Sequence, residues 1–301
     1  MKRPLHPRTY PTWASIILLR LVSYLPYRIM MAIGSLIGLI ALFTMRSRKR
    51  IAEINFKLCF PQKSETERSE LLNENFKSMG KGLMEVAIAW WWSDERIKSL
   101  QIETKGLEDL NSSHGTIFLT AHFSSLELSA RLLGQHAESY AMYRPHANEV
   151  LQYHYEKYRS NYSLGIISRD DVRSMVKALK HNKGIWFAPD QNFARKGFVF
   201  SSFFGIHAAT NPATSRFAEL TGAKVIPFRL VRSLNGYELS FEKALGGFPS
   251  GSHQKDTDVI NSTFQDWVSK DPSQYNWIHR RFKTQPPDIA PPYKKLTKSN
   301  A

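Results

Sequence analysis

The amino-terminal part of the chain is its most apolar stretch. Residues 13–45 are rich in Leu, Ile, Met, Ala and Gly, and residues 29–45 form the uninterrupted section. A spanning helix needs roughly 20 apolar residues, so this length is marginal. A basic run, 46–50, follows. These flanking arginines and Trp13 favour a membrane anchor over residues 1–50, either spanning or lying in the interface, and a buried core helix is the alternative.

Residues 64–100 have a helical pattern. Ser64 and Glu67 have the spacing of a capping box, which predicts that a helix begins there. Apolar residues then recur at spacings of mostly three and four up to a tryptophan triplet at 90–92. Such a triplet suits a membrane interface or the mouth of an apolar pocket, or else a large core patch.

Beyond residue 115 the pattern alternates between short apolar strands and amphipathic helices. This alternation predicts an α/β fold with a mixed, largely parallel central sheet flanked by helices, in a domain spanning residues 51–301. The proline-rich, basic tail from residue 286 is expected to be loose. The strands are expected at 116–121, 139–144, 184–189, 224–232 and 237–242, and the helices at 124–134, 172–180, 213–222 and 256–268.

The charge balance is strongly basic. Forty-one Lys and Arg against 26 Asp and Glu give a net charge of +15. A basic surface attracts phosphate groups, whether in nucleic acid, anionic lipid or an acidic protein. The single cysteine, Cys59, cannot form an intramolecular disulfide. We see no metal-binding or nucleotide-binding motif and therefore expect no metal and no cofactor.

His122 and Glu127 form the pattern with the clearest chemical meaning. His122 follows an expected strand and precedes an expected helix, which places it at the carboxyl end of a parallel strand, where active sites gather. If Glu127 lies in the first helical turn, its carboxylate can fold back toward the imidazole and orient it as a general base for an alcohol. There are two plain alternatives. Ser124 and Glu127 also have capping-box spacing, and His122 could be a satisfied buried histidine.

Several blocks in order resemble a known family. The segment at 121–127, AHFSSLE, resembles the His-x4-acid block of the glycerolipid acyltransferase superfamily, most closely its late lipid A acyltransferase branch of Gram-negative bacteria. That branch carries Glu where the wider superfamily has Asp. The third block lacks the Gly-Thr-Arg of glycerol-phosphate enzymes. The other matching blocks are 143–151, 159–193 with Gly-x-x-x-Arg at 165–169 and Phe-Ala-Pro-Asp at 187–190, 225–227 and 275–284.

The resemblance implies a function. The chain would transfer a fatty acyl chain from acyl carrier protein to a hydroxyl of an acyl chain on a Kdo-modified lipid A precursor. His122 would be the general base, and Glu127 would orient and charge it. The carrier protein is acidic, so the basic surface would help it dock. The enzyme would lie at the bacterial inner membrane with its catalytic domain on the cytoplasmic side.

The acceptor carries phosphates and carboxylates, which arginines bind well. Arg159 and Arg169 are the first candidates for acceptor binding, with Arg144 beside them. Asp190 is expected to fix Arg159 or Arg169, or to bind a glucosamine hydroxyl. A pair of basic residues near the carboxyl terminus, Arg280 and Arg281, are weaker candidates, and the tryptophans at 90–92 are expected to frame the acyl pocket.

Two other functions stay open at the level of sequence. One is a glycerophospholipid acyltransferase that uses acyl-CoA or acyl carrier protein, against which the missing Gly-Thr-Arg speaks. The other is a non-catalytic basic module that binds membrane or nucleic acid, although no nucleic-acid motif is recognisable and we expect no such partner. Acyl chain length, the position acylated and the oligomeric state are not encoded in any motif.

Overall fold

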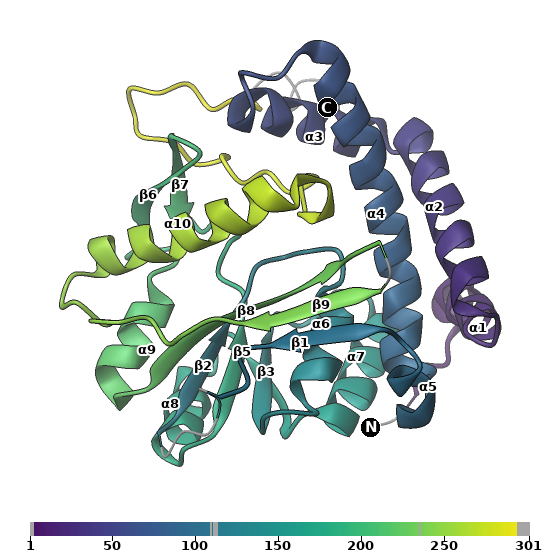
Figure 1. Cartoon of the computed structure of the whole chain (residues 1–301), viewed down its shortest axis with the longest axis horizontal. Coiled ribbons are helices and arrows are strands. Elements are labelled where there is room, and N and C mark those ends of the chain that lie inside the picture. The colour runs from purple at the N-terminus through teal and green to yellow at the C-terminus, as the bar shows by residue number, and fades with distance from the viewer. Residues whose placement is uncertain (1–2, 109, 111–113, 235, 294–301) are drawn as a thin grey trace.

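A computed structural model describes residues 3–108, 110, 114–234 and 236–293 (Figure 1). In the described residues, five α-helices precede the sheet: α1 (Tyr10–Val22), α2 (Tyr27–Thr44), α3 (Arg46–Cys59), α4 (Glu65–Trp91) and α5 (Asp94–Lys98). Ser64 accepts a hydrogen bond from the Glu67 amide while the Glu67 side chain accepts one from Ser64, so the capping box predicted at α4 is confirmed. The helical segment expected up to residue 100 is interrupted at 92–93, between α4 and α5.

A seven-stranded sheet follows, in the order β1-β9-β8-β2-β5-β3-β4. Every neighbouring pair is parallel except β8 and β9, which are antiparallel, so the prediction of a mixed, largely parallel sheet flanked by helices is confirmed. A separate antiparallel hairpin pairs β6 with β7. The strands are β1 (Ile102–Lys105), β2 (Thr116–Leu119), β3 (Ser139–Tyr143), β4 (Gly165–Ser168), β5 (Gly184–Phe187), β6 (Val199–Phe203), β7 (Ile206–Thr210), β8 (Lys224–Arg232) and β9 (Tyr237–Phe241).

The helices between the strands cover both faces of the sheet. Because neighbouring residues of a strand point to opposite faces, Phe118 and Trp186 pack in one apolar core while Ile117 and Ile185 pack in another. The first core also holds residues of α4, α6 and α7, and the second holds residues of α8, α9 and α10. These helices are α6 (Leu126–Leu133), α7 (Glu149–Tyr162), α8 (Val172–Lys180), α9 (Ala213–Thr221) and α10 (His253–Lys270).

Helix α2 lies side by side with the long helix α4 at one end of the sheet (Figure 1). Glycines make this close approach possible. A Cβ at Gly38 would lie 2.1 Å from the Phe76 carbonyl oxygen, and one at Gly80 would lie 1.9 Å from that of Gly34. One face of α2 is therefore packed on the domain. By length and composition, α2 is the one helix in the described chain that could cross a membrane, and 28% of it is buried.

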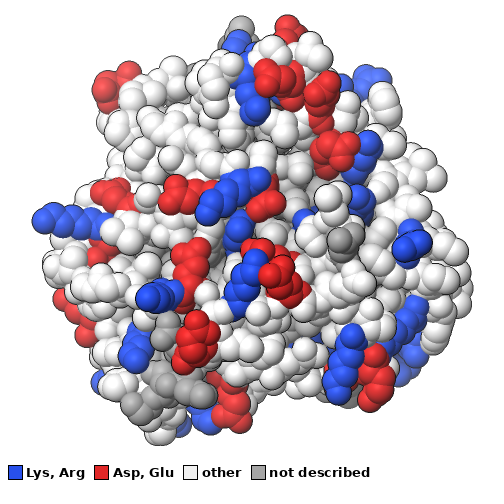
Figure 2. Space-filling view, viewed as in Figure 1, with Lys and Arg blue, Asp and Glu red and all other residues white. Residues whose placement is uncertain are grey.

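Large apolar side chains remain exposed on the other faces of α1 and α2. They include Ile17, Leu18 and Leu21 on α1, and Leu36, Ile40 and Phe43 on α2. Exposed apolar side chains outside these helices, such as Leu220 and Val259, are scattered along the chain. On the face shown in Figure 2, Lys and Arg alternate with Asp and Glu, with no single-sign field.

The carboxyl-terminal tail is ordered further than expected. Tyr293 is buried, and its hydroxyl donates a hydrogen bond of 2.5 Å to Asn55 Oδ1 on α3. The prediction of a loose tail is therefore wrong for the residues up to 293, and residues 294–301 lie outside the described part.

Candidate active site

The register of the parallel strands explains which residues meet. In the β2–β5 pair, Leu119 lies opposite Phe187, and His122 and Asp190 each follow three residues later. In the β3–β4 pair, Tyr143 lies opposite Ser168, and Arg144 and Arg169 come directly after them. All four strands point the same way, so these side chains gather at one edge of the sheet, at its carboxyl end.

Asp190 holds His122 at two points. The Asp190 carboxylate accepts the His122 backbone N–H at 3.0 Å and lies 2.5 Å from the ring Nδ1. The Asp190 side chain is 2% exposed, whereas the imidazole is 27% exposed. A carboxylate on Nδ1 fixes the tautomer with the proton there, which leaves Nε2 as the lone-pair nitrogen. The expectation that Asp190 fixes Arg159 or Arg169 is wrong, since its carboxylate binds the histidine. Its binding of a glucosamine hydroxyl stays a prediction.

Asp190 is ionised at neutral pH. Burial by itself would raise its pKa, but the charge of His122 and the hydrogen bonds from its ring and amide lower the pKa to about 2. A permanently negative group behind the imidazole stabilises the imidazolium that forms when Nε2 takes a proton. The geometry therefore has the parts of a general base and its orienting acid.

Glu127 lies elsewhere and does not fulfil the role expected of it next to His122. Its carboxylate accepts hydrogen bonds from Arg159 Nη2 at 2.7 Å, the Tyr162 hydroxyl at 2.6 Å and Trp90 Nε1 at 3.1 Å. Burial would raise the pKa of Glu127, but the Arg159 charge and these bonds lower it below the usual value. The folding-back of this carboxylate onto the imidazole is therefore a wrong prediction.

Glu127 is not a helix cap either. Helix α6 begins at Leu126 after Ser125, and no side chain caps it. The Ser124 hydroxyl instead lies 2.8 Å from the Ser78 hydroxyl of α4. The capping-box alternative is thus wrong as well, and Glu127 forms a buried ion pair with Arg159.

A cavity of about 730 Å³ opens over the edge of the sheet that carries these residues. It is lined by His122 and by the three arginines predicted to bind the acceptor, namely Arg144, Arg159 and Arg169. The structure therefore brings together the expected base and the expected acceptor-binding residues. None of the described residues form a cluster suited to a metal ion.

The tryptophans at 90–92 are not among the residues that line this cavity. Trp90 donates to Glu127, Trp91 Nε1 donates to the Tyr158 hydroxyl at 2.8 Å, and Trp92 Nε1 donates to the Ser23 carbonyl at 2.9 Å. Of the three, Trp90 therefore supports the Glu127–Arg159 pair, and none of them frames the cavity. The tryptophan in the wall is Trp186, over whose ring the Arg159 guanidinium lies at 5.1 Å.

Arginines gather on one side of the cavity. Arg195 Nη1 donates to Asp170 at 2.7 Å, while Arg169 Nε lies 3.8 Å from the same carboxylate and is a buried donor with no hydrogen-bond partner among the described residues. Burial and then the charges of Arg195 and Arg144 lower the pKa of Arg169. Three guanidinium groups around one carboxylate leave an excess of positive charge, which favours an anion.

One residue of the site was not among the candidates predicted from the sequence. His279 also lines the cavity, and its Nε2 accepts the Asn192 amide at 3.1 Å. Burial lowers the pKa of His279 to about 4, so it is neutral. Arg281, a weaker candidate for acceptor binding, is buried, donates to the Ala209 carbonyl at 3.0 Å and is not among the residues that line the cavity. The neighbouring Arg280 is not among the residues that line the cavity.

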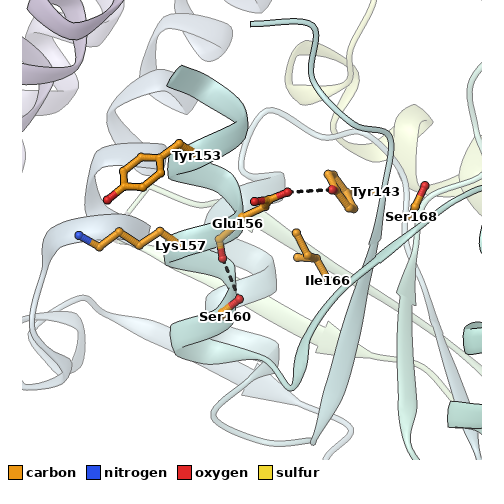
Figure 3. A pocket seen from close by; sticks show the side chains of 7 residues that line it. All are labelled: Tyr143, Tyr153, Glu156, Lys157, Ser160, Ile166 and Ser168. Atoms are coloured by element: carbon orange, nitrogen blue, oxygen red, sulfur yellow. Dashed lines mark hydrogen bonds between the residues drawn. The ribbon is translucent and has the colours of Figure 1, made fainter. Parts of the chain in front are cut away.

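A second cavity of about 570 Å³ lies between α7 and the strands β3 and β4 (Figure 3). Tyr143 lines both cavities. Its hydroxyl donates to Glu156 at 3.2 Å, as the dashed line in Figure 3 shows. Glu156 therefore fixes the side chain of a residue that lines both cavities.

The chain is similar to characterised proteins over nearly its whole length. Residues 1–284 match the family model described as bacterial lipid A biosynthesis acyltransferase. The chain is 36% identical to the lipid A biosynthesis palmitoleoyltransferase of Escherichia coli K12, covering 94% of each, and 35% identical to the lauroyltransferase of the same strain, covering 96% of each. A solved 1-acyl-sn-glycerophosphate acyltransferase from Thermotoga maritima overlaps more distantly, with 14% identity and a TM-score of 0.39 over 85% of this chain and 96% of that one.

Proposed function

Because this chain belongs to the bacterial lipid A biosynthesis acyltransferase family, we propose that it moves a fatty acyl chain from acyl carrier protein to a hydroxyl on an acyl chain of a Kdo-modified lipid A precursor. The observation that carries the mechanism is the His122–Asp190 pair at the wall of the large cavity. The imidazole is the one partly exposed member of that pair, so it is the member that meets the acceptor.

In the proposed reaction, His122 Nε2 takes the proton of the acceptor hydroxyl as the oxygen attacks the thioester carbonyl carbon. The C–O bond forms, the C–S bond breaks, and the leaving thiolate receives the proton from the imidazolium. Asp190 stabilises that imidazolium between the two proton transfers. The products are an ester and the free thiol of the carrier, with no other reactant consumed.

Glu127 has a different part in this proposal from that of Asp190. Arg159 lines the cavity and is held by two of its nitrogens on the Glu127 carboxylate. We assign Arg159 to the charge that develops on the thioester oxygen, and Glu127 to fixing the direction of the guanidinium. Preorganised donors of this kind stabilise an oxyanion without rearrangement.

The proposed acceptor matches the excess of positive charge. The arginine group made by Arg144, Arg169 and Arg195 would bind a phosphate or carboxylate of the precursor, because guanidinium groups form paired hydrogen bonds to such oxyanions. The buried unpaired Nε of Arg169 supports this assignment, since a ligand oxygen would satisfy it.

The membrane contact would be made by residues 1–50. The exposed apolar faces of α1 and α2 would enter the lipid, and the basic run that opens α3 would face anionic headgroups of the cytoplasmic leaflet. Since α2 is also packed along α4, this contact would hold the acyltransferase domain against the inner membrane, which is where we propose that it meets its lipid acceptor.

The test is a transfer assay with the full chain in membranes. Labelled acyl groups are offered on acyl carrier protein or on coenzyme A, with the Kdo-modified precursor or a 1-acylglycerol phosphate as acceptor. We expect acylated precursor from the carrier-protein donor and none from the His122→Ala variant. Equal transfer rates from acyl carrier protein and from coenzyme A would refute the assignment of the carrier protein as donor. Acylation of the 1-acylglycerol phosphate alone would refute the assignment of the lipid A precursor as acceptor.

A further inference from the structure

The loop that carries His122 is clamped on two sides. The Ser124 amide donates to the Gln274 carbonyl at 2.8 Å, and the Asn276 amide donates to the His122 carbonyl at 3.0 Å. Helix α4 also approaches the loop so closely that a Cβ at Gly82 would lie 2.4 Å from the Ser124 carbonyl oxygen. The loop therefore depends on contacts from outside its own segment.

Arg232, the last residue of β8, contacts this loop and both of the segments that hold it, α4 and the segment around Gln274. Its Nη2 donates to the hydroxyls of Ser124 and Ser78, and its Nη1 lies 2.5 Å from the Glu85 carboxylate of α4. The Arg232 backbone N–H donates to the Gln274 side-chain oxygen at 2.9 Å, and the Arg232 carbonyl accepts from the Gln274 side-chain nitrogen at 2.9 Å. One arginine thus contacts the loop, the helix and the segment beyond.

The hydrogen bonds continue from Glu85 to the amino-terminal helix. The Tyr237 hydroxyl donates to Glu85 at 2.7 Å and accepts from the Tyr27 hydroxyl at 3.1 Å. Tyr27 is the first residue of α2, the helix with the exposed apolar face. Glu85 is fully buried and the Arg232 side chain is 10% exposed, so water does not compete strongly for these bonds.

We propose that Arg232 is a positioning residue for His122. The hydrogen bonds through Glu85 and Tyr237 then couple the position of the loop that carries His122 to the position of α2 against the domain. This inference rests on the proposed role of His122 as the general base. Displacing a reacting group by about 1 Å can lower a rate by as much as about 100-fold, so a small movement of Ser124 has a measurable effect.

The test separates positioning from folding. Arg232→Ala would leave the Glu85 charge buried and unpaired, so Ser124→Ala is the informative change because it keeps that ion pair. We expect a roughly tenfold lower kcat with KM for both substrates within about twofold. The matched control is Ser129→Ala, whose hydroxyl bonds only the Leu126 carbonyl of its own helix, and it should keep the wild-type kcat. A raised KM with unchanged kcat, or no effect, would overturn the proposal.

The second arm concerns α2. Tyr27→Phe removes one hydroxyl and should lower kcat by a factor of about two to five, whereas Tyr24→Phe, on an exposed residue outside these bonds, should not. Hydrogen exchange of the full chain gives a reading independent of catalysis. Faster exchange at residues 122–125 in Ser124→Ala supports the clamp, and unchanged exchange refutes it. If wild type transfers no acyl group, the proposed function fails, while the exchange result still decides the clamp.

Discussion

His122 and Asp190 are joined by two hydrogen bonds although 68 residues separate them in the chain. The Asp190 carboxylate binds both the backbone amide and the ring Nδ1 of His122. It therefore fixes both where the histidine sits and how its ring is turned. Glu127, five residues from His122, binds Arg159 instead.

Asp190→Asn is the direct test of this pair. The amide keeps the shape but loses the charge and leaves the ring free to adopt the other tautomer, so we expect kcat to fall by roughly 10²–10⁴-fold, by comparison with loss of the orienting acid in a serine protease triad. The control is Asp171→Asn, because Asp171 caps α8 and asparagine caps equally well. Wild-type turnover by Asp190→Asn would remove Asp190 from the mechanism.

The Glu127–Arg159 pair has separable effects on stability and activity. Glu127→Gln leaves a buried guanidinium without its counter-charge, so the free energy of unfolding should drop by about 3–5 kcal/mol. The double variant Glu127→Met/Arg159→Leu should recover much of that stability and remain inactive. Denaturant unfolding and the transfer assay measure the two quantities. Restored activity in the double variant would show that the pair is only structural.

The arginine group should act on binding and not on chemistry. Arg169→Gln is expected to raise KM for the lipid acceptor about tenfold and to change kcat little, because the lost contact is made equally in ground and transition states. High salt should weaken acceptor binding in wild type more than in the variant. Arg173→Gln, on the exposed side of α8, is the matched control. A fall in kcat without a rise in KM contradicts this assignment.

The lowered pKa of His279 predicts that the free energy of unfolding falls when the pH is lowered. Its pKa in the folded state is lowered by burial to about 4, from 6.5, so the unfolded chain binds the proton first as the pH falls. Its contribution is fully present above about pH 6.5 and is lost on the way down to about pH 4, for a change of about 3 kcal/mol. His279→Gln, which retains an acceptor for the Asn192 amide, should make the free energy of unfolding depend less on pH between about pH 6.5 and 4. An unchanged slope would count against a buried neutral His279.

Asp190 should contribute at lower pH than His279. Its pKa is lowered to about 2, so its contribution is present above about pH 4 and is lost between about pH 4 and 2. Comparing the unfolding free energies of wild type and Asp190→Asn across that range measures it, and parallel curves would be inconsistent with the lowered pKa.

The exposed face of α2 should govern membrane binding. The triple change Leu36→Glu, Ile40→Glu and Phe43→Glu alters only exposed positions, so the fold should persist while the chain leaves the lipid fraction in a flotation experiment. Val259→Glu with Ile289→Glu places acids on exposed apolar positions away from α1 and α2 and should not change partitioning. Retention of the triple variant on vesicles would place the membrane contact elsewhere.

The local sequence was sufficient for several features. Alternating apolar strands and amphipathic helices predict the α/β class because each pattern matches a backbone period. The Ser64–Glu67 cap, confirmed at α4, depends on residues three positions apart. The ordered motifs indicate the family from their spacing along the chain, and they single out His122, Arg144, Arg159 and Arg169, all of which line one cavity.

The tertiary structure decided which acidic side chain of the site pairs with His122 and which pairs with Arg159. Whether Glu127 or Asp190 meets the imidazole depends on which strands are neighbours, and the order β2-β5 aligns Leu119 with Phe187. Asp190 thereby reaches His122, while helix α7 brings Arg159 to Glu127. Strand order is set by the burial of whole faces across the domain, which no short motif records. The sequence therefore determined which residues stand at strand ends, and the sheet determined which of them touch.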